Sequence, residues 1–457
     1  MTAGLIRAIL GCSLHAATGK GIPLSAGCTV ARGFYRTRRP QQTPLYRLVE
    51  ALYDQVKGVW EERFKARYGF WRGFVDGVVQ RYLDCGVFRA GLARVWCPSC
   101  HAEYLVACSC RGRGLCPSCG AKRAAEFTAL LLDEVLEPVC HRMWTFTLPK
   151  MVRPYFLHHR ELLGRLCRAA YETVEELMAA AAFGADGFRT GMVATVHLCG
   201  DLLTLNPHVH ALAPRGGWAS DGSWVPVPFV DERCAELVFR RKVLAVLKAE
   251  GLLSEEREQL LLSWRHRTGF SADASVKVEP EDKAAVKRLA RYILRPPVSL
   301  DRMEWQEGSD EVVYARKARR GRPGAEERMD ALDFLARLIA YIPEPRRQTV
   351  FYYAWYSNVS RGRRRKGRDP ELATHVKNDE LDGFSPAERQ ARRRAWARLI
   401  KLVYEVSPLT CPRCGEEMRI LSVILDPKVV DRILDHLASK GIEPGRPPPP
   451  DLAAVGS

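Results

Sequence analysis

The chain has 457 residues, of which 47% are hydrophobic and 27% are charged, and its formal net charge is +17. This composition excludes a wholly disordered chain and indicates two to four folded domains. The excess of positive charge favours nucleic acid as the partner, and no apolar run is long enough to cross a bilayer, so we expect no membrane partner.

The secondary structure is predicted from the spacing of apolar residues. Steps of three and four residues predict helices, and alternation of apolar with polar residues predicts strands. The predicted helices span residues 43–82, 121–136, 154–182, 230–251, 255–262, 281–294 and 329–341. The predicted strands span residues 142–148, 192–198, 202–213 and 311–315.

The two ends of the chain are predicted to be disordered. Residues 1–42 are basic, and their apolar core is too short and broken for a signal peptide. Residues 441–457 contain a run of prolines. The domains predicted between these ends are a helical, zinc-binding domain at 43–137, a mixed domain at 138–325, a basic helical region at 326–400 and a small cysteine-containing module at 401–440.

Two Cys-x-x-Cys pairs, Cys97 with Cys100 and Cys116 with Cys119, are separated by fifteen residues. Each pair can place two thiolates about one tetrahedral zinc ion, and the spacing suits a short ribbon. The ribbon could lie along DNA, or it could only support its neighbours. In a basic chain that we expect to be cytoplasmic, clustered cysteines favour metal over disulfides. Two further cysteines lie between the pairs, and either could replace one ligand: Cys108 and Cys110.

A third pair, Cys411 and Cys414, has no partner pair nearby. His436 is available as a third ligand, but nothing obvious supplies a fourth. The pair is therefore a half-site, a relic, or a possible second zinc site completed by another part of the chain.

Two histidines, His208 and His210, lie one residue apart within an apolar run. On a β-strand they project from the same face while Val209 packs behind. Two neutral imidazoles on a rigid strand can bind a divalent cation. The competing interpretation is two inert, hydrogen-bonded histidines on a sheet surface.

Tyr292 is the candidate nucleophile on the predicted helix that ends before Pro296. Arg288 lies four residues before it and Arg295 three residues after it, so cationic neighbours would favour the phenolate and attract a phosphate. The competing interpretation is a packed or surface tyrosine. Arg291, beside Tyr292, is a further candidate phosphate contact.

An aromatic stretch and two basic blocks follow. Tyr352 and Tyr356 have the four-residue spacing of one helical face, and with Tyr353 they suit either base stacking or core packing. They are also competing nucleophiles. The basic blocks at 361–368, which includes Arg363 and Arg364, and at 392–398 would add salt-sensitive affinity for DNA.

Together and in order, these motifs resemble those of the rolling-circle transposases of the insertion-sequence 91 type and their common-region relatives, over residues 46–437. The resemblance is carried by the segments Ser109 to Cys119, Phe146 to Pro149, Leu205 to His210, Leu289 to Pro297 and Tyr352 to Asn358. It implies an α+β fold: the helical and zinc-ribbon module, then a His-hydrophobic-His endonuclease domain at 138–325 with an antiparallel sheet flanked by helices, then the basic helical region.

The resemblance also implies site residues. The family's zinc-binding segment maps to Cys97, Cys100, Cys116 and Cys119, with Cys110 also at a family position. Many relatives carry a second tyrosine where this chain has Arg288, so the chain is similar to the single-tyrosine variants. His197 lies where relatives often have Gln, and it is a candidate third ligand of the catalytic metal; a carboxylate, an amide or water are the alternatives.

The expected function is DNA transposition through single-strand cleavage. Tyr292 would attack the scissile phosphate to give a 5′-phosphotyrosine, while His208 and His210 hold Mg²⁺ or Mn²⁺. The expected substrates are single-stranded and hairpin DNA at element termini, met at the bacterial nucleoid in the cytoplasm. The alternatives are a plasmid replication initiator or relaxase with the same chemistry, and a zinc-dependent DNA-binding protein with a decayed catalytic site. The oligomeric state stays open.

Overall fold

A computed structural model of the chain describes residues 39–182, 185–227, 230–264, 268–316, 324–368 and 409–445. Most of the predicted N-terminal extension, the basic block at 392–398 and the proline-rich end of the tail lie outside the described residues. In the part of the chain that the structure describes, no helix is both long and apolar enough to cross a membrane.

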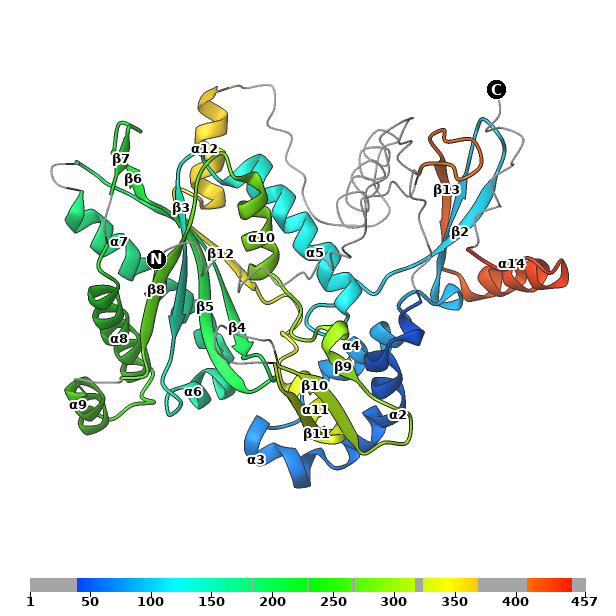
Figure 1. Ribbon diagram of the computed structural model, residues 1–457, viewed down its shortest axis with the longest axis horizontal. Helices are drawn as coiled ribbons and strands as arrows, with labels where there is room; N and C mark the ends of the chain where they lie inside the picture. The colour runs from blue at the N-terminus through cyan, green and yellow to red at the C-terminus, as the bar shows by residue number, and fades with distance from the viewer. Residues whose placement is uncertain are drawn as a thin grey trace, which may run out of the picture.

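A five-stranded antiparallel sheet, called the central sheet below, lies in the left half of the molecule in the view of Figure 1. Its strands, in spatial order, are β12 (Val350–Ala354), β4 (Gly191–Cys199), β5 (Leu205–Pro214), β3 (His141–Thr147) and β8 (Ser271–Val278). The predicted α+β class with an antiparallel sheet flanked by helices is therefore confirmed.

Strand alternation gives this sheet two different faces. One face carries Trp144, Phe146 and Val209, which pack against α7 (Leu163–Ala181) and α8 (Glu232–Ala249). The opposite face carries Val193 and Leu212, which pack with α5 (Pro117–Leu130) and α10 (Lys283–Ile293). Since side chains on a strand alternate, His197, His208 and His210 share the face that α10 covers.

The N-terminal helices form a second core with a distant part of the chain. α2 (Pro44–Gly58), α3 (Lys65–Tyr68) and α4 (Phe74–Leu83) share this core with α11 (Ala331–Ala340) and with the sheet β11-β10-β9, formed by Glu326–Asp330, Glu311–Ala315 and Met303–Glu304. The predicted helix at 43–82 is interrupted at Gly69, whose φ of 84° ends α3. The segments 303–316 and 324–340 thus pack with the N-terminal helices, and they lie on both sides of the domain boundary predicted at 325.

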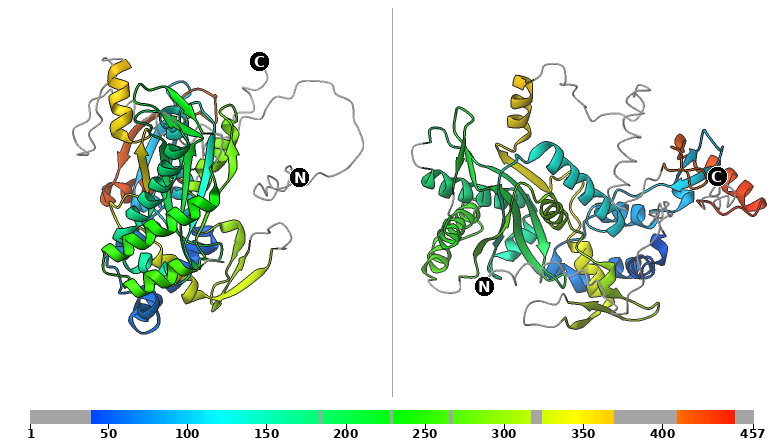
Figure 2. Two further views of the ribbon diagram at one scale, coloured as in Figure 1. Left: turned by 90° about the vertical axis from the view of Figure 1, so that its left-hand side faces the viewer. Right: turned by 45° about the horizontal axis from the view of Figure 1, so that its top comes forward.

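A third sheet joins the last described strand to a hairpin in the N-terminal half. β13 (Arg419–Ile424) pairs antiparallel with β1 (Leu92–Trp96), which pairs with β2 (Glu103–Ala107), and α14 (Pro427–Ser439) packs beside them. This sheet stands apart from the central sheet in Figure 1 and in the right-hand view of Figure 2. The small module predicted at 401–440 therefore shares its sheet with the N-terminal half.

The remaining elements are short or peripheral. They are β6 (Gly216–Trp218), β7 (Trp224–Pro226), α6 (Arg153–His158), α9 (Glu255–Ser263), α12 (Asn358–Arg368) and the turns η1 (Pro40–Gln42), η2 (Trp60–Phe64), η3 (Phe88–Ala90), η4 (Leu131–Val135), η5 (Arg160–Leu162) and η6 (Leu300–Arg302).

Candidate active site and cysteine clusters

Three histidines meet on neighbouring strands of the central sheet. His208 and His210 project from β5, and His197 of β4 pairs directly with His208. One ring nitrogen from each histidine lies within 4.8 Å of the other two. The structure therefore brings His197 to the predicted pair, whereas the sequence left a carboxylate, an amide and water as alternatives.

Hydrogen bonds to backbone carbonyls determine which nitrogen of the His197 and His208 rings is available to bind a metal. Nδ1 of His208 donates to the carbonyl of Asn206 at 2.6 Å, and Nε2 of His197 donates to the carbonyl of Ile293 at 2.6 Å. A carbonyl only accepts, so the other nitrogen of each ring keeps its lone pair. Nδ1 of His210 lies 3.2 Å from the Thr145 hydroxyl, and its Nε2 is buried without a hydrogen-bond partner among the described residues.

Burial keeps these three imidazoles neutral. It lowers the pKa of His197 to about 3 and that of His208 to about 4, and it holds the pKa of His210 well below 6.5. Neighbouring positive charge on Arg295 acts in the same direction. Neutral imidazole is the form that binds a metal. The buried, unpartnered Nε2 of His210 and the fixed tautomers of His197 and His208 therefore fit a divalent cation.

Tyr292 lies against this cluster. Its ring meets that of His210 edge to face, with centroids 4.9 Å apart and planes at 70°. The guanidinium carbon of Arg295 lies 4.5 Å from the centre of the Tyr292 ring. α10 carries the tyrosine, and the helix begins after Asp282, whose carboxylate accepts from the Ala285 N–H at 2.8 Å. The predicted nucleophile and metal ligands thus come together.

The other two candidate arginines of α10 are exposed. Arg288 forms an ion pair with Asp282 at 3.8 Å, towards the start of the helix, and Arg291 lies on the solvent side. Of the three predicted phosphate contacts, Arg295 alone stacks on the Tyr292 ring.

A cavity of about 900 Å³ opens beside the histidines. His197 and Arg295 line it from the central sheet and the end of α10, and Arg113 and Arg123 line it from the cysteine-containing segment. The cavity therefore brings positive charge from two distant parts of the chain to a space that His197, one of the three clustered histidines, lines.

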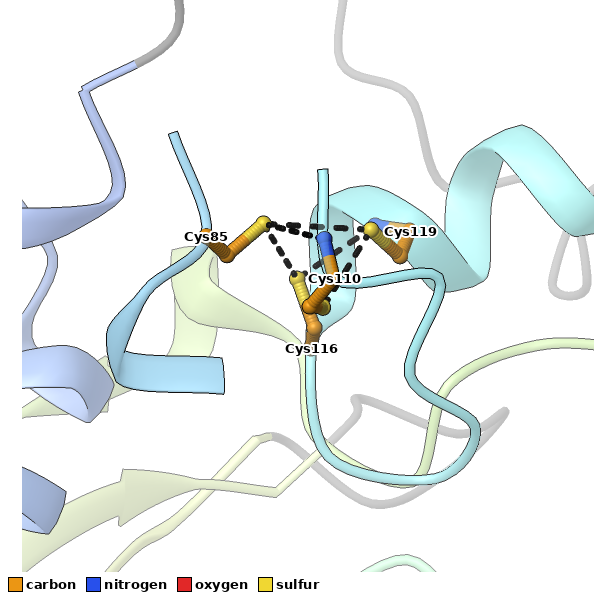
Figure 3. Close-up of side chains that lie close together, drawn as sticks. All are labelled: Cys85, Cys110, Cys116 and Cys119. Carbon is orange, nitrogen blue, oxygen red and sulfur yellow. Dashed lines mark hydrogen bonds between the residues drawn. The ribbon is translucent and has the colours of Figure 1, made fainter. Parts of the chain in front are cut away.

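Four cysteines of the N-terminal half form one cluster, shown in Figure 3: Cys85, Cys110, Cys116 and Cys119. The Cys85 sulfur lies 3.8 Å from that of Cys116 and 3.9 Å from that of Cys119. Tetrahedral zinc with bonds of about 2.3 Å places sulfurs about 3.8 Å apart. Cys116 is the N-cap of α5 and accepts from the Cys119 N–H, so the first turn of this helix presents both thiols.

The predicted pairing of the two Cys-x-x-Cys motifs is wrong. Cys97 and Cys100 belong to a different cluster, with Cys411 and Cys414. The reason is the β1–β2 hairpin, because it pairs with β13 and so turns the first motif towards the tail.

Cys85 lies in the cluster of Cys116 and Cys119, where the sequence predicted the first Cys-x-x-Cys motif. It is a lone cysteine just beyond α4, so it has no spacing to signal a ligand. Cys110 does lie in the cluster with Cys116 and Cys119, as its family position implied. His436, offered as a ligand for the tail cysteines, is exposed on α14 and belongs to neither cluster.

Tyr352 lies on the strand β12 and Tyr356 lies in the turn after it, so the prediction that the two share one helical face is wrong. Tyr353 stacks face to face on Tyr171, with centroids 4.7 Å apart, whereas Tyr352 lies half-buried on the opposite face of β12. Tyr356 is fully buried, and its hydroxyl donates to Nε2 of His141 at 2.7 Å. The prediction that Tyr356 contacts bases is therefore also wrong.

The two arginines of the first basic block differ in their surroundings. Arg363 is exposed on α12. Arg364 donates to the carbonyl of Trp355 at 2.8 Å, pairs with Glu137 at 3.5 Å and lies over the Trp355 ring. Arg364 thus holds α12 against the body of the protein, which leaves Arg363 as the better placed of the two to meet a ligand.

Comparison with known proteins agrees with the site. Residues 191–364, which include the three histidines and Tyr292, match the family model of a putative transposase, and residues 57–148 match that of a transposase zinc-binding domain. The chain is 26% identical over 362 residues to the transposase for insertion sequence element IS801 of Pseudomonas savastanoi pv. phaseolicola. This match covers 74% of this chain and 82% of that protein.

A shorter match is to the putative transposase y4qJ of Sinorhizobium fredii, with 31% identity over 157 residues, 33% of this chain and 38% of that protein. No solved structure matches the chain.

Proposed function

Because this chain belongs to the transposases of the insertion-sequence 91 type, we propose that it nicks and rejoins single-stranded DNA at the ends of its element. The observation that carries this proposal is the meeting of Tyr292 with His197, His208 and His210 on one face of the central sheet. A hydroxyl nucleophile beside a cluster of neutral imidazoles that can hold a cation suits phosphoryl transfer.

In the proposed cleavage, the Tyr292 oxygen attacks the scissile phosphorus as its phenolic proton leaves. The bond from phosphorus to the 3′ oxygen breaks, and that oxygen takes up a proton. The products are a 5′-phosphotyrosine and a free 3′-hydroxyl. Attack by a 3′-hydroxyl on the phosphotyrosine reverses these changes, so strands are rejoined without ATP. With Tyr292 alone, one chain carries one such linkage at a time.

His197, His208 and His210 would hold the catalytic cation. When bound, Mg²⁺ or Mn²⁺ would supply positive charge against the phosphate oxygens. Three imidazoles favour Mn²⁺ over Mg²⁺, because Mg²⁺ prefers oxygen ligands. Arg295, stacked on Tyr292 and lining the same cavity, is suited to attract the phosphate and to hold the phenol in place.

The DNA strand would reach the site through the cavity and over exposed arginines. Arg113 and Arg123 line the cavity, while Arg288, Arg291 and Arg363 lie on the surface. Such contacts bind the phosphate backbone without reading the sequence. The substrates would be the single-stranded or hairpin ends of the element, at the nucleoid.

Cys85, Cys110, Cys116 and Cys119 would hold a structural zinc within the matched zinc-binding domain. The helix that presents Cys116 and Cys119 also packs against α10. This zinc would therefore stabilise the support of the nucleophile rather than take part in the chemistry.

The test is to incubate the purified chain with labelled single strands from both flanks of its coding region and Mn²⁺, and to resolve covalent adducts on a denaturing protein gel. We expect a labelled adduct with the wild type and none with Tyr292→Phe or with the His208→Ala/His210→Ala double variant. Tyr352→Phe, a half-buried tyrosine in the same core, is the matched control and should keep the adduct.

An adduct that survives in Tyr292→Phe and disappears in Tyr352→Phe would refute the assigned nucleophile. Tight binding with no adduct on any strand would refute cleavage and favour the zinc-dependent DNA-binding protein.

A further inference from the structure

Two loops that are far apart in the sequence have the same backbone structure. The N–H of Cys97 donates to the carbonyl of Ala102, five residues on, and that of His101 donates to the carbonyl of Cys97. In the tail, the N–H of Cys411 donates to the carbonyl of Glu416, again five residues on, and that of Gly415 donates to the carbonyl of Cys411. The two Cys-x-x-Cys loops thus form the same turn.

The residue after each second cysteine confirms the likeness. His101 has a φ of 58° and Gly415 a φ of 80°, both in the left-handed region. A side chain rarely adopts this conformation, so His101 indicates a turn fixed by its surroundings. The N–H groups of Ser99 and Cys100 also point at the Cys97 sulfur, and their tail counterparts at the Cys411 sulfur.

The four sulfurs of these loops face one another. The Cys97 sulfur lies 3.5 Å from that of Cys414, and the Cys100 sulfur lies 3.4 Å from that of Cys411. All four lie within 4.8 Å of one another, around the separation of about 3.8 Å that tetrahedral zinc gives to its sulfur ligands. Four thiolates are a set that zinc prefers.

We propose that Cys97, Cys100, Cys411 and Cys414 form a second structural zinc site, which fastens the C-terminal segment to the β1–β2 hairpin. The matched zinc-binding domain ends at residue 148, so it contains only half of these ligands. The other half comes from the tail, beyond the last residue of the matched transposase segment at 364.

The core around these cysteines is small, which indicates that a metal would stabilise the attachment of the tail. Three of the four cysteines, Cys97, Cys100 and Cys411, share a small cluster that includes the buried side chains of Val95, Tyr104, Leu409 and Met418. A core this small does not hold a chain segment in place alone, and small folds commonly use a metal instead. Zinc therefore fixes β13 at the edge of its sheet, and with it α14.

Zinc content of the purified full-length chain tests the proposal. We expect about two zinc ions per chain in the wild type and about one in the Cys411→Ser/Cys414→Ser double variant. Cys85→Ser/Cys110→Ser should also hold about one, because it removes the other site. Cys234→Ser, an exposed cysteine outside both clusters, is the control and should hold two. One zinc in the wild type, or two in the tail double variant, would overturn the proposal.

A second measurement uses only the wild-type chain, so it does not depend on how the variants fold. Cys414 and Cys234 are both exposed. Alkylation followed by peptide mass spectrometry should modify Cys234 at once and spare Cys414, and a chelator should then release the four cysteines of the proposed site together. Reaction of Cys414 as fast as Cys234 before chelation, or disulfides among the four, would overturn the proposal.

These results are separate from those for DNA cleavage. Zinc at the tail site is measured without DNA, and the cleavage site is tested by the Tyr292 adduct. Failure of either proposal thus leaves the other intact.

Discussion

The imidazole of His210 and the phenol of Tyr292 meet edge to face with ring centroids 4.9 Å apart, although one belongs to β5 and the other to α10. No covalent or hydrogen-bonded link between the two rings sets this distance among the described contacts. It is set by how α10 packs on the sheet, through Ala290 and Ile293. Nucleophile and candidate metal ligands are therefore positioned by helix packing, together with the hydrogen bond from His197 to the carbonyl of Ile293.

Arg295→Gln should slow adduct formation roughly 10- to 100-fold, because a contact with a charged group contributes about 1.5–3 kcal/mol. The substitution removes the guanidinium that lies over Tyr292 and lines the cavity. Lys287→Gln, at an exposed position on α10, the helix that carries Tyr292, is the control and should change the rate little. The measurement is the initial rate of adduct formation at saturating DNA. Equal rates for both variants would contradict a role for Arg295.

Gly120→Ala should weaken both stability and cleavage. A Cβ at this position of α5 would lie 2.7 Å from Cγ of Pro296, which follows Arg295 directly. Alanine gains up to about 1 kcal/mol of helix propensity, but overpacking costs about 1–3 kcal/mol, and the proline ring has little freedom to move. The clash should prevail, lowering the free energy of unfolding by about 1 kcal/mol.

The control for this substitution is Gly58→Ala, at the end of α2, where nothing lies within 4 Å of the added atom. Urea unfolding and adduct rates should be compared for both variants, with zinc content measured alongside. A Gly120→Ala chain with wild-type stability and rate would show that Pro296 moves freely.

The sequence was sufficient to predict which residues form the candidate active site on one face of the sheet. Strand alternation places His208 and His210 together whatever their partners are, and the helix pattern before Pro296 locates Tyr292. These signals are local, so they survive without knowledge of the fold. The Leu-rich and Val-rich helices were predicted for the same reason.

Non-local pairings left no such signal. Cys85 has no neighbouring cysteine in the sequence. The first Cys-x-x-Cys motif has two candidate partners with the same internal spacing, one nearby and one at the other end of the chain. β8 was missed although polar and apolar residues alternate along it, because the first two apolar positions hold only the small side chains of Ala272 and Ala274. Tyr352 and Tyr356 were misjudged because an aromatic run suits a strand as well as a helix.

His141 should contribute to a loss of folding stability on acidification, alongside the three histidines of the candidate site. Burial lowers the pKa of His141 to about 4, whereas an unfolded histidine has a pKa near 6.5. Below pH 6.5 the unfolded chain therefore binds a proton that the folded chain does not. The stability is complete above pH 6.5 and falls as the pH approaches 4, by about 2–3 kcal/mol at pH 4.5 for this group.

Urea unfolding of His141→Asn at pH 7.5 and pH 4.5 measures this contribution. The variant should be less stable at pH 7.5, because the Tyr356 hydroxyl loses its partner, yet it should lose less stability between the two pH values than the wild type. His436→Asn, at an exposed position, should behave as the wild type does. An unchanged difference in His141→Asn would place the acid sensitivity elsewhere.

Arg363 and Arg364 should respond differently to the same substitution. Arg363→Gln should reduce the dependence of single-strand binding on salt by a slope of about 0.7, the value for one phosphate contact, with no change in stability. Arg364→Gln should instead lower stability, because it removes the contacts with Trp355 and Glu137. Fluorescence anisotropy across a salt series and thermal unfolding together distinguish the two. A salt slope that changes only in Arg364→Gln would reverse the assignment.

The two halves of the proposed tail zinc site are made at different times during translation. Cys100 and Cys411 are 311 residues apart, so at about 5–20 residues per second the first loop waits roughly 15–60 s for the second. Cys116 and Cys119 leave the ribosome within that interval, and their spacing from Cys97 and Cys100 suits a local zinc ribbon. The growing chain thus meets a competing metal site, and early binding of zinc there must be reversed before the native pairing can form.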